Sequence, residues 1–236
     1  LLREAIRVFG CRFVQSYGQT ESSSSIVALA PEDHTLDNVP HMRSAGKALP
    51  GVELEIRDET GQRLPPGEVG EIVPRSSSNM AGYANMPAET AATLDADGWL
   101  RTGDAGCMDE QGFIYVKDRI KEMIITGGEN VYPAEVENAL YGHPAVLDVA
   151  VIGVPSAKWG QAVKAVVTLR PGQQANEAEL IAWARQRIGG YKLPKSIDFV
   201  DALPRNSTGK VIKGELRKHY AHPDPTPLVH CEGDAR

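Results

Sequence analysis

The sequence is poor in cysteine and has no long apolar run. Its 236 residues include only three cysteines, Cys11, Cys107 and Cys231, which are spaced too widely to indicate a disulfide framework or a zinc knuckle. This usage is typical of a reduced compartment, so we expect a cytoplasmic protein. No stretch approaches the roughly 18 apolar residues that a membrane helix needs, and no signal peptide is visible.

Basic charge is also scarce. The formal net charge is −6, which disfavours nucleic acid as a partner, because phosphate binding requires clustered lysine and arginine. One basic cluster near the end of the chain is interrupted by Glu215 and is most simply a solvated helix face; its members are Lys210, Lys213, Arg217 and Lys218. With 42% hydrophobic and 24% charged residues, the composition suits an ordinary globular protein with a real core.

The chain does not begin with methionine. It opens with an apolar helical face that ends at Gly10, a typical helix stop; this face comprises Leu1, Leu2, Ala5, Ile6 and Phe9. A start inside a helix predicts that the sequence is a piece of a longer protein.

Two kinds of pattern divide the rest of the chain. Residues 46–117 contain short alternating runs separated by turns, which predicts a small antiparallel β-barrel or sandwich. Beyond residue 118 strands and helices interleave, as in an α+β module. We therefore expect an α+β protein with a large-domain portion over 1–117, a hinge at 118–121, a small mobile domain over 122–221, and a disordered, proline-bearing tail over 222–236.

Local signals place several elements of the second module. Pro133 is expected at the first position of a helix, and Asn176 with Glu179 resembles a capping box that opens another. Strands are predicted over 121–126, 146–154, 163–169 and 197–200, and a final helix over 213–220.

Two segments of the first region carry residues suited to nucleotide chemistry. Residues 17–21 combine an aromatic ring, a glycine, a hydroxyl and a carboxylate, which together can stack a base, admit it, contact a phosphate and hold Mg²⁺. Asp104 follows a tight turn, and a carboxylate can accept hydrogen bonds from both hydroxyls of a ribose. Either segment alone is explained more simply as a turn whose polar side chains bond their own backbone.

Two further segments lie at and beyond the change of pattern. Residues 117–122, followed by paired glycines at 127–128, fit a hinge beside a backbone that approaches a ligand closely; a solvated linker and a hairpin turn are the simpler explanation. Lys210 ends a loop that begins at Pro204, where an ammonium group could meet the charge of a carboxylate attacking a phosphate. Taken alone, it is a surface lysine.

In their order and spacing, these segments resemble the adenylate-forming superfamily of acyl-CoA synthetases, luciferases and peptide-synthetase adenylation domains. The resemblance covers residues 1–220 and is strongest to bacterial medium- and long-chain fatty-acyl-CoA synthetases. The matching segments are the YG-x-TE segment at 17–21, the GY-x₃-P-x₂-T element (Gly82, Tyr83, Pro87, Thr90), the TGD motif at 102–104, the hinge and thioester-side motif at 118–137, and the catalytic-lysine loop at 204–210.

The resemblance implies how ATP would be held. Tyr17, next to Gly18 in the same cofactor-binding segment, would stack on adenine. Thr20 would contact the α-phosphate. Asp104 would bind the ribose hydroxyls, and Arg119 would contact the ribose as well.

It also implies the parts that carry the chemistry. Glu21 would hold Mg²⁺, and Lys121 falls at the family's hinge position. Gly127 and Gly128 would line the tunnel for the pantetheine arm of coenzyme A (CoA). Lys210 would bridge the substrate carboxylate and the α-phosphate during adenylation.

The implied enzyme is an acid–thiol ligase. It would convert a carboxylic acid, expected to be a fatty acid, and ATP into an acyl-adenylate and pyrophosphate, and then form a thioester with CoA. Adenylation brings two anions together, so a cation and Mg²⁺ at the reacting oxygens would lower the barrier. Thiolation needs a different entrance, which rotation about a hinge provides.

Several alternatives stay open. The superfamily's serine/threonine/glycine-rich phosphate loop ending in lysine is absent from this sequence, so we expect the isolated chain to be an inactive fragment or a binding module. The parent enzyme is alternatively an aryl-CoA ligase. The Pro204-x₄-Gly209-Lys210 context resembles that in which such synthetases are switched off by acetylation, so a lysine acetyltransferase is an expected partner.

Overall fold

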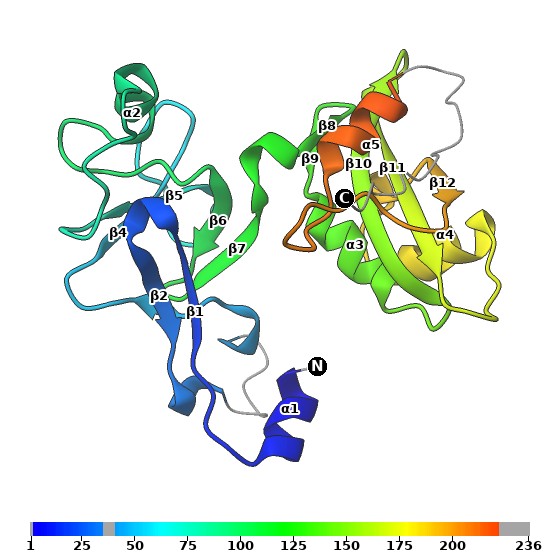
Figure 1. The fold of residues 1–236 in the computed structure, drawn as a ribbon, viewed down its shortest axis with the longest axis horizontal. Helices are drawn as coiled ribbons and strands as arrows, with labels where there is room; N and C mark the ends of the chain where they lie inside the picture. The colour runs from blue at the N-terminus through cyan, green and yellow to red at the C-terminus, as the bar shows by residue number, and fades with distance from the viewer. Residues whose placement is uncertain (1, 35–40, 222–236) are drawn as a thin grey trace, which may run out of the picture. The chain divides into compact units, whose positions relative to one another are not determined.

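The chain divides into two compact units, the first ending at Lys121 and the second beginning at Glu122. The computed structural model describes residues 2–34 and 41–221 (Figure 1). The predicted tail at 222–236 lies outside the described residues. Among the helices that are described, none is long and apolar enough to cross a membrane.

An amphipathic helix opens the first unit. α1 (Leu2–Phe9) follows the predicted apolar spacing, and Gly10 ends it with φ +59°, a left-handed conformation that glycine adopts at little cost. The amide of Gly10 donates to the carbonyl of Ile6 at 3.2 Å. The predicted helix and its stop are therefore confirmed.

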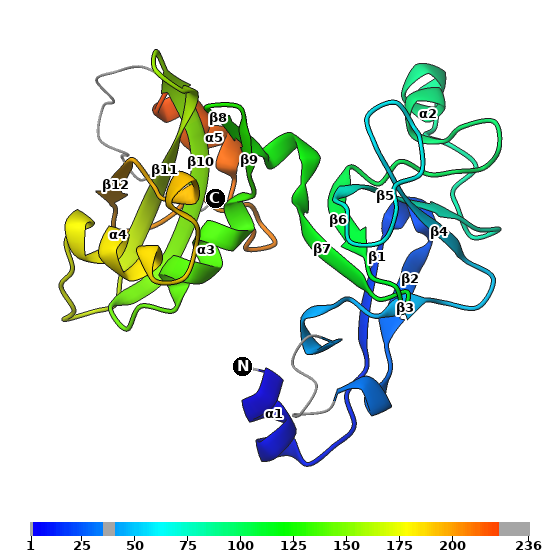
Figure 2. The same cartoon turned by 180° about the vertical axis from the view of Figure 1, so that it is seen from behind.

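Two antiparallel sheets make up the rest of the first unit (Figure 2). The first has the order β1-β2-β3, formed by β1 (Gln15–Gln19), β2 (Ser24–Leu29) and β3 (Lys47–Ala48). The second has the order β4-β5-β6-β7, formed by β4 (Glu53–Arg57), β5 (Gly70–Arg75), β6 (Asp104–Met108) and β7 (Ile114–Arg119), with α2 (Pro87–Thr93) between β5 and β6. Short 3₁₀ helices lie at Thr20–Ser22, Pro31–Asp33 and His41–Arg43.

The second sheet is open, so the barrel that was one of the two forms predicted over 46–117 is wrong. Among the described strands β4 and β7 are the two ends of the order and do not pair. The outer edge of β7 is taken instead by Ala45 and Gly46, which exchange backbone hydrogen bonds with Ile114 at 2.7 and 2.8 Å. The buried face of this second sheet packs against Ile26 and Val27 of β2. The alternation of apolar and polar residues along a strand shows that one face of its sheet is covered, but not what covers it.

The second unit is a five-stranded sheet with helices on both faces. Its strands are β8 (Ile124–Thr126), β9 (Glu129–Val131), β10 (Val146–Ser156), β11 (Gly160–Leu169) and β12 (Ser196–Phe199). Its helices are α3 (Pro133–Tyr141), α4 (Glu177–Arg185) and α5 (Lys213–His219), with a 3₁₀ helix at Gly190–Lys192. Another 3₁₀ helix, Ile120–Glu122, spans the boundary between the two units. β10 pairs with β11 over its whole length, and β12 joins β11 in parallel.

Residue alternation along β10 and β11 builds two cores. Val151 and Val167 face α3 and α4, whereas Ile152 and Val166 face Leu216 of α5. Because both faces are covered, the central stretches of these strands, 149–152 and 165–167, are uninterrupted runs of valine, isoleucine and alanine. Figure 1 shows α5 on one side of this sheet and the α3–α4 pair on the other.

The local signals of the second module are confirmed with one exception. Pro133 occupies the start of α3, and the side chain of Asn176 accepts from the amide of Glu179 at 2.9 Å to cap α4. The strand predicted over 121–126 is shorter than expected, because β8 begins only at Ile124 and a 3₁₀ turn precedes it. Hydrogen bonds of that turn run to partners outside the sheet, among them Ile120 N–H to the carbonyl of Gly103.

Candidate functional site

Three of the predicted nucleotide-binding residues meet in the first unit. The Tyr17 hydroxyl, on β1, donates to Asp104 Oδ2 at 2.6 Å, and Arg119 Nε, at the end of β7, lies 2.8 Å from Asp104 Oδ1. Asp104 begins β6, which pairs directly with β7. The sheet therefore brings together side chains that are 87 and 15 positions from Asp104 in the sequence.

This cluster holds one carboxylate in a largely buried setting. The Asp104 side chain is 10% exposed, while that of Arg119 is 41% exposed and faces solvent in part. Burial raises the pKa of Tyr17, and its hydrogen bond to the Asp104 carboxylate raises that pKa further. The Tyr17 hydroxyl therefore stays protonated at neutral pH and acts as a hydrogen-bond donor to Asp104. Each oxygen of Asp104 uses one acceptor position here and keeps another, so the carboxylate fits a vicinal diol.

The turn before Asp104 is anchored to β5. The Thr102 hydroxyl donates to the carbonyl of Ile72 at 2.6 Å and accepts from the amide of Asp104 at 3.1 Å. Gly103 has φ +69°, a left-handed conformation that favours glycine. The carbonyl of Thr102 accepts from Arg119 at 3.2 Å, so the same turn also holds the end of β7.

The predicted magnesium ligand, Glu21, lies in the 3₁₀ turn that follows β1. Its Oε1 accepts from the Tyr83 hydroxyl at 2.9 Å, and this hydrogen bond raises the pKa of Tyr83. No three His, Cys, Asp or Glu side chains gather as a metal cluster within 2–34 and 41–221. A single carboxylate suits Mg²⁺, which is usually held by one or two carboxylates together with substrate phosphates.

The GY-x₃-P-x₂-T element explains how Tyr83 is placed. Pro87 starts α2, and the hydroxyl of Thr90 in that helix accepts from the amide of Tyr83 at 2.9 Å. A Cβ on Gly82 would lie 2.8 Å from Thr90 Cγ2, so only glycine fits there. The hydrogen bond from Tyr83 to Glu21 was not predicted, although the matching element contained Tyr83.

Gly18 allows two backbone segments to lie close together at this site. The register of β1 against β2 shifts between Tyr17 and Gly18, and a Cβ on Gly18 would overlap the carbonyl of Ser24. Ser24 itself has φ +104°, an unusual conformation for a residue with a side chain. The glycine thus permits the close approach that turns the chain from Tyr17 toward Thr20, which is exposed at the start of the 3₁₀ turn.

Replacing Gly18 should therefore cost stability. We expect Gly18→Ala to lower the free energy of unfolding by about 2 kcal/mol or more, because two backbone segments must separate. Gly51→Ala is the matched control: Gly51 has φ +82° but no heavy atom within 4 Å of an added Cβ, so it measures strain alone, about 1 kcal/mol. Chemical denaturation followed by fluorescence checks both variants. Equal losses would show that the close approach at Gly18 is unimportant.

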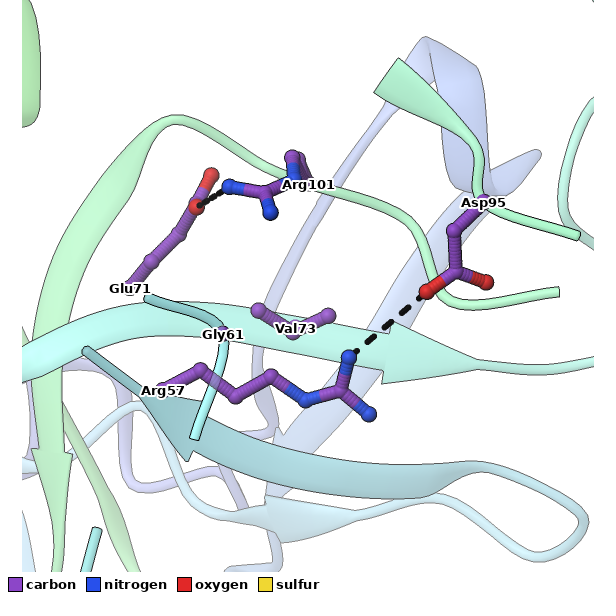
Figure 3. Close-up of a pocket in the computed structure, with 6 residues that line it drawn as sticks. All are labelled: Arg57, Gly61, Glu71, Val73, Asp95 and Arg101. Carbon is purple, nitrogen blue, oxygen red and sulfur yellow. Dashed lines mark ion pairs between the residues drawn. The ribbon is translucent and has the colours of Figure 1, made fainter. Parts of the chain in front are cut away.

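A small cavity lined by charged side chains lies beside β5. Arg57, Gly61, Glu71, Val73, Asp95 and Arg101 line it, as Figure 3 shows, and its volume is about 10 Å³, room for one water molecule. Arg57 pairs with Asp95 at 3.6 Å and Arg101 with Glu71 at 3.5 Å. The cavity is too small for a substrate, but Glu71 also contacts the Asp104 turn.

The paired glycines of the second unit form a hairpin turn. Thr126 pairs with Glu129 across Gly127 and Gly128, whose φ values are +60° and +86°. A two-residue turn with positive φ at both positions is the favoured connection between antiparallel strands. A Cβ on Gly127 would also lie 3.0 Å from the Trp159 ring. The simpler hairpin explanation thus holds, and the role toward CoA stays a prediction.

The Lys210 loop is held by its own side chains. Asn206 Oδ1 accepts from the amides of Thr208 and Lys210 at 3.1 and 2.8 Å. Arg205 donates to the carbonyl of Gly209 and pairs with Asp148 of β10. Lys210 itself is exposed and lies three residues before α5. The loop therefore presents its ammonium group from an ordered turn.

Residues on both sides of Lys121, the last residue of the predicted hinge, make contacts within their own units: Ile120 with Gly103 and Glu122 with Arg217. Lys121 is exposed in the 3₁₀ turn Ile120–Glu122. The carboxylate of Glu122, the first residue of the second unit, pairs with Arg217 of α5 at 2.5 Å. The structure thus brings together Tyr17, Asp104 and Arg119 in the first unit. Lys121 is not among the partners of that cluster, and Gly127 and Lys210 belong to the second unit.

Two comparisons with known protein families decide the relationship. The model described as "AMP-binding enzyme" matches residues 1–84, and that described as "AMP-binding enzyme C-terminal domain" matches residues 135–210. The chain belongs to the adenylate-forming (AMP-binding) superfamily. Together the matches fall on both units, and they correspond to the carboxyl-terminal portion of these enzymes.

Relatives and a solved structure of this superfamily show the same coverage. A fatty acid–[acyl-carrier-protein] ligase from Streptomyces coeruleorubidus, ScoC, is 43% identical over 93% of this chain and 42% of its own length. The medium/long-chain-fatty-acid–CoA ligase FadD8 of Mycobacterium tuberculosis is 43% identical over 93% of this chain and 39% of its own. The O-succinylbenzoate CoA synthetase of Bacillus subtilis, solved with ATP and magnesium, is 38% identical with a TM-score of 0.81, over 94% of this chain and 43% of that one.

These proteins place the chain in the acyl-CoA ligase family of the superfamily. They act on fatty acids or an aryl acid by their names, so the family membership does not specify the acid. The chain spans about two fifths of the length of the relatives it matches.

Proposed function

We propose that this chain is the part of an ATP-dependent acyl-CoA synthetase that binds the ribose of ATP and supplies the adenylating lysine. The observation that carries the proposal is the Tyr17–Asp104–Arg119 cluster, which offers a partly buried carboxylate with unused acceptor positions on both oxygens. As the substrate we propose a medium- or long-chain fatty acid, since two relatives act on fatty acids by their names; an aryl acid, the substrate by name of other relatives, is the alternative.

In the proposed adenylation, a carboxylate oxygen of the acid attacks the α-phosphorus of ATP, and pyrophosphate leaves. Asp104 and Arg119 hold the ribose, Tyr17 stacks on the adenine beside Gly18, and Thr20 donates to the α-phosphate. Mg²⁺, held by Glu21, would neutralise charge on the phosphates. Lys210 holds the attacking carboxylate against the α-phosphate, so that the two anions can approach each other.

In the proposed second step, a thiolate attacks the acyl carbonyl and AMP leaves. Residues 118–121, with Lys121 among them, serve as the hinge between the two half-reactions, and Gly127 and Gly128 line the path of the pantetheine arm. A turn without Cβ atoms lets a ligand lie against the backbone. CoA is the proposed acceptor. ScoC, by its name, charges an acyl-carrier protein instead, so the acceptor is part of the test.

Pyrophosphate release by the whole protein tests this function. With ATP and Mg²⁺ we expect release that depends on a fatty acid, weak release with benzoate- or cinnamate-type acids, and a thioester with CoA rather than with a pantetheinylated carrier protein. Preference for aryl acids would change the substrate class but keep the enzyme class. No pyrophosphate exchange with any carboxylic acid would exclude the function.

A second measurement asks what this chain does by itself, apart from the whole enzyme. By calorimetry, the 236-residue chain is expected to bind ATP weakly through Asp104 and Arg119 and to turn over no substrate. Turnover by this chain alone would show that the missing phosphate loop is dispensable.

A further inference from the structure

The carboxylate of Glu71 reaches the turn that carries Asp104. Glu71 lies on β5, and its Oε1 accepts from the amide of Gly103 at 2.9 Å. Its Oε2 lies 3.5 Å from Arg101, the pair marked in Figure 3. The Glu71 side chain is 14% exposed, and a hydrogen bond from an amide to a partly buried carboxylate is among the stronger ones in proteins.

This bond holds the amide end of the peptide between Thr102 and Gly103, which the threonine hydroxyl does not reach. The hydroxyl of Thr102 already binds the carbonyl of Ile72 and the amide of Asp104. The Gly103 amide between them points to Glu71, while the carbonyl of the same peptide, that of Thr102, accepts from Arg119 and Gln19 at 3.2 and 3.3 Å. The Gly103 carbonyl, in the next peptide, accepts from Ile120 at 2.8 Å. Gly103 has no side chain and a left-handed φ, so loss of Glu71 would leave this peptide held at its carbonyl end only and free to tilt.

Rotation of that peptide would move the Asp104 carboxylate. Asp104 is the next residue, and its two oxygens already bond Tyr17 and Arg119. A vicinal diol must reach the remaining acceptor positions on both oxygens at once, which tolerates little tilt. The ion pair with Arg101 is longer and its arginine is 51% exposed, so it contributes little by itself.

We propose that Glu71 is a positioning residue for ribose recognition, acting through the Gly103 amide to aim Asp104 at the two ribose hydroxyls. The inference rests on the proposed function, because it requires that Asp104 binds the ribose of ATP. Glu71 is 32 residues from Gly103 in the sequence and belongs to none of the segments that predicted the site.

Kinetics of the whole protein with ATP and with 2′-deoxy-ATP test the proposal. Glu71→Ala is expected to lower kcat/KM for ATP about tenfold, mainly through KM, and to leave kcat/KM for 2′-deoxy-ATP within about twofold. Glu71→Gln keeps an oxygen that accepts from Gly103 and should restore most of the preference for ATP. Glu71→Asp keeps the charge but shortens the reach, so it should lose the preference even if the alanine variant fails to fold.

Two matched controls separate positioning from stability. Glu53→Ala removes a carboxylate of the neighbouring strand β4, which pairs with Arg75 at 2.5 Å and has no contact with the turn, so the preference should not change. Arg101→Gln removes the ion pair alone and should change the preference less than about twofold.

A double-mutant cycle gives the deciding result. In an Asp104→Ala background, Glu71→Ala should cost less than about twofold, because a residue that acts through Asp104 has nothing left to position. An equal loss for both nucleotides, or the same loss in both backgrounds, would overturn the proposal. If the wild-type protein makes no adenylate from any acid, the proposed function fails; if it makes adenylate and Glu71→Ala keeps the preference, only this inference fails.

Discussion

Lys210→Ala is expected to slow adenylate formation by about two to three orders of magnitude, since it removes a cation from the point where two anions meet. Formation of the thioester from a supplied acyl-adenylate should change little, because the carboxylate has already reacted. Pyrophosphate release measures the first step, and CoA consumption with a synthetic acyl-adenylate measures the second. Because Lys210 is exposed and its loop is held by Asn206, folding should be unaffected.

Another exposed lysine, Lys218, supplies the control for this prediction. Lys218→Ala removes an exposed ammonium from α5 and should leave both steps unchanged. Lys210→Gln, which resembles acetyl-lysine in lacking charge, should match the alanine variant. If it does, loss of the charge alone stops adenylation, which is the effect expected of acetylation of Lys210 by a lysine acetyltransferase. Equal loss of both steps in Lys210→Ala would contradict the division of roles.

Asp104→Asn should weaken ATP binding about tenfold to a hundredfold, because hydrogen bonds to a charged group are each worth about 1.5–3 kcal/mol. The substitution also removes one hydrogen bond that the carboxylate makes now. The asparagine nitrogen cannot accept from the Tyr17 hydroxyl or pair with Arg119, so only the asparagine oxygen can keep one of these two partners. We expect the increase in KM for ATP to exceed the fall in kcat, and the preference for ATP over 2′-deoxy-ATP to disappear. Initial rates of pyrophosphate release check this.

Asp109→Asn is a closely matched control for Asp104→Asn. Asp109 follows the same strand, and it too accepts from a tyrosine hydroxyl, that of Tyr115, at 3.1 Å. Its other contacts are backbone amides of its own turn, which an asparagine oxygen can still accept. Nucleotide kinetics should therefore stay close to wild type. Similar losses in both variants would show that Asp104 acts on the stability of the sheet rather than on ribose.

Local chemistry predicted much of the second unit. Pro133 and Asn176 mark helix starts that the structure confirms, because a missing amide and a capping oxygen act within one turn of the chain. The matching segments likewise pointed to Tyr17, Asp104 and Arg119, and the structure brings these three side chains together.

What the sequence did not reveal depends on long-range pairing. The helix α2 was missed because only a proline and a threonine distinguish it within a region of alternating runs. Whether the alternating strands form a barrel or a sandwich stayed open, since no local pattern shows that Gly46 occupies the edge of β7. Glu71 escaped notice because its partner, the amide of Gly103, exists only once β5 and β6 are side by side.

The turn that carries Asp104 also holds the last residues before the second unit. Arg119 bonds the carbonyl of Thr102 and the carboxylate of Asp104, and Ile120 bonds the carbonyl of Gly103. Any ligand that draws on Asp104 therefore competes with, or reinforces, a contact that fixes the end of β7. Thermodynamic linkage is reciprocal, so whatever alters that end of the strand must change the affinity for that ligand by the same factor. Occupancy of the proposed nucleotide site and the conformation of residues 118–121 are then expected to be coupled, so a spectroscopic probe at Lys117 should report ATP binding without contacting ATP.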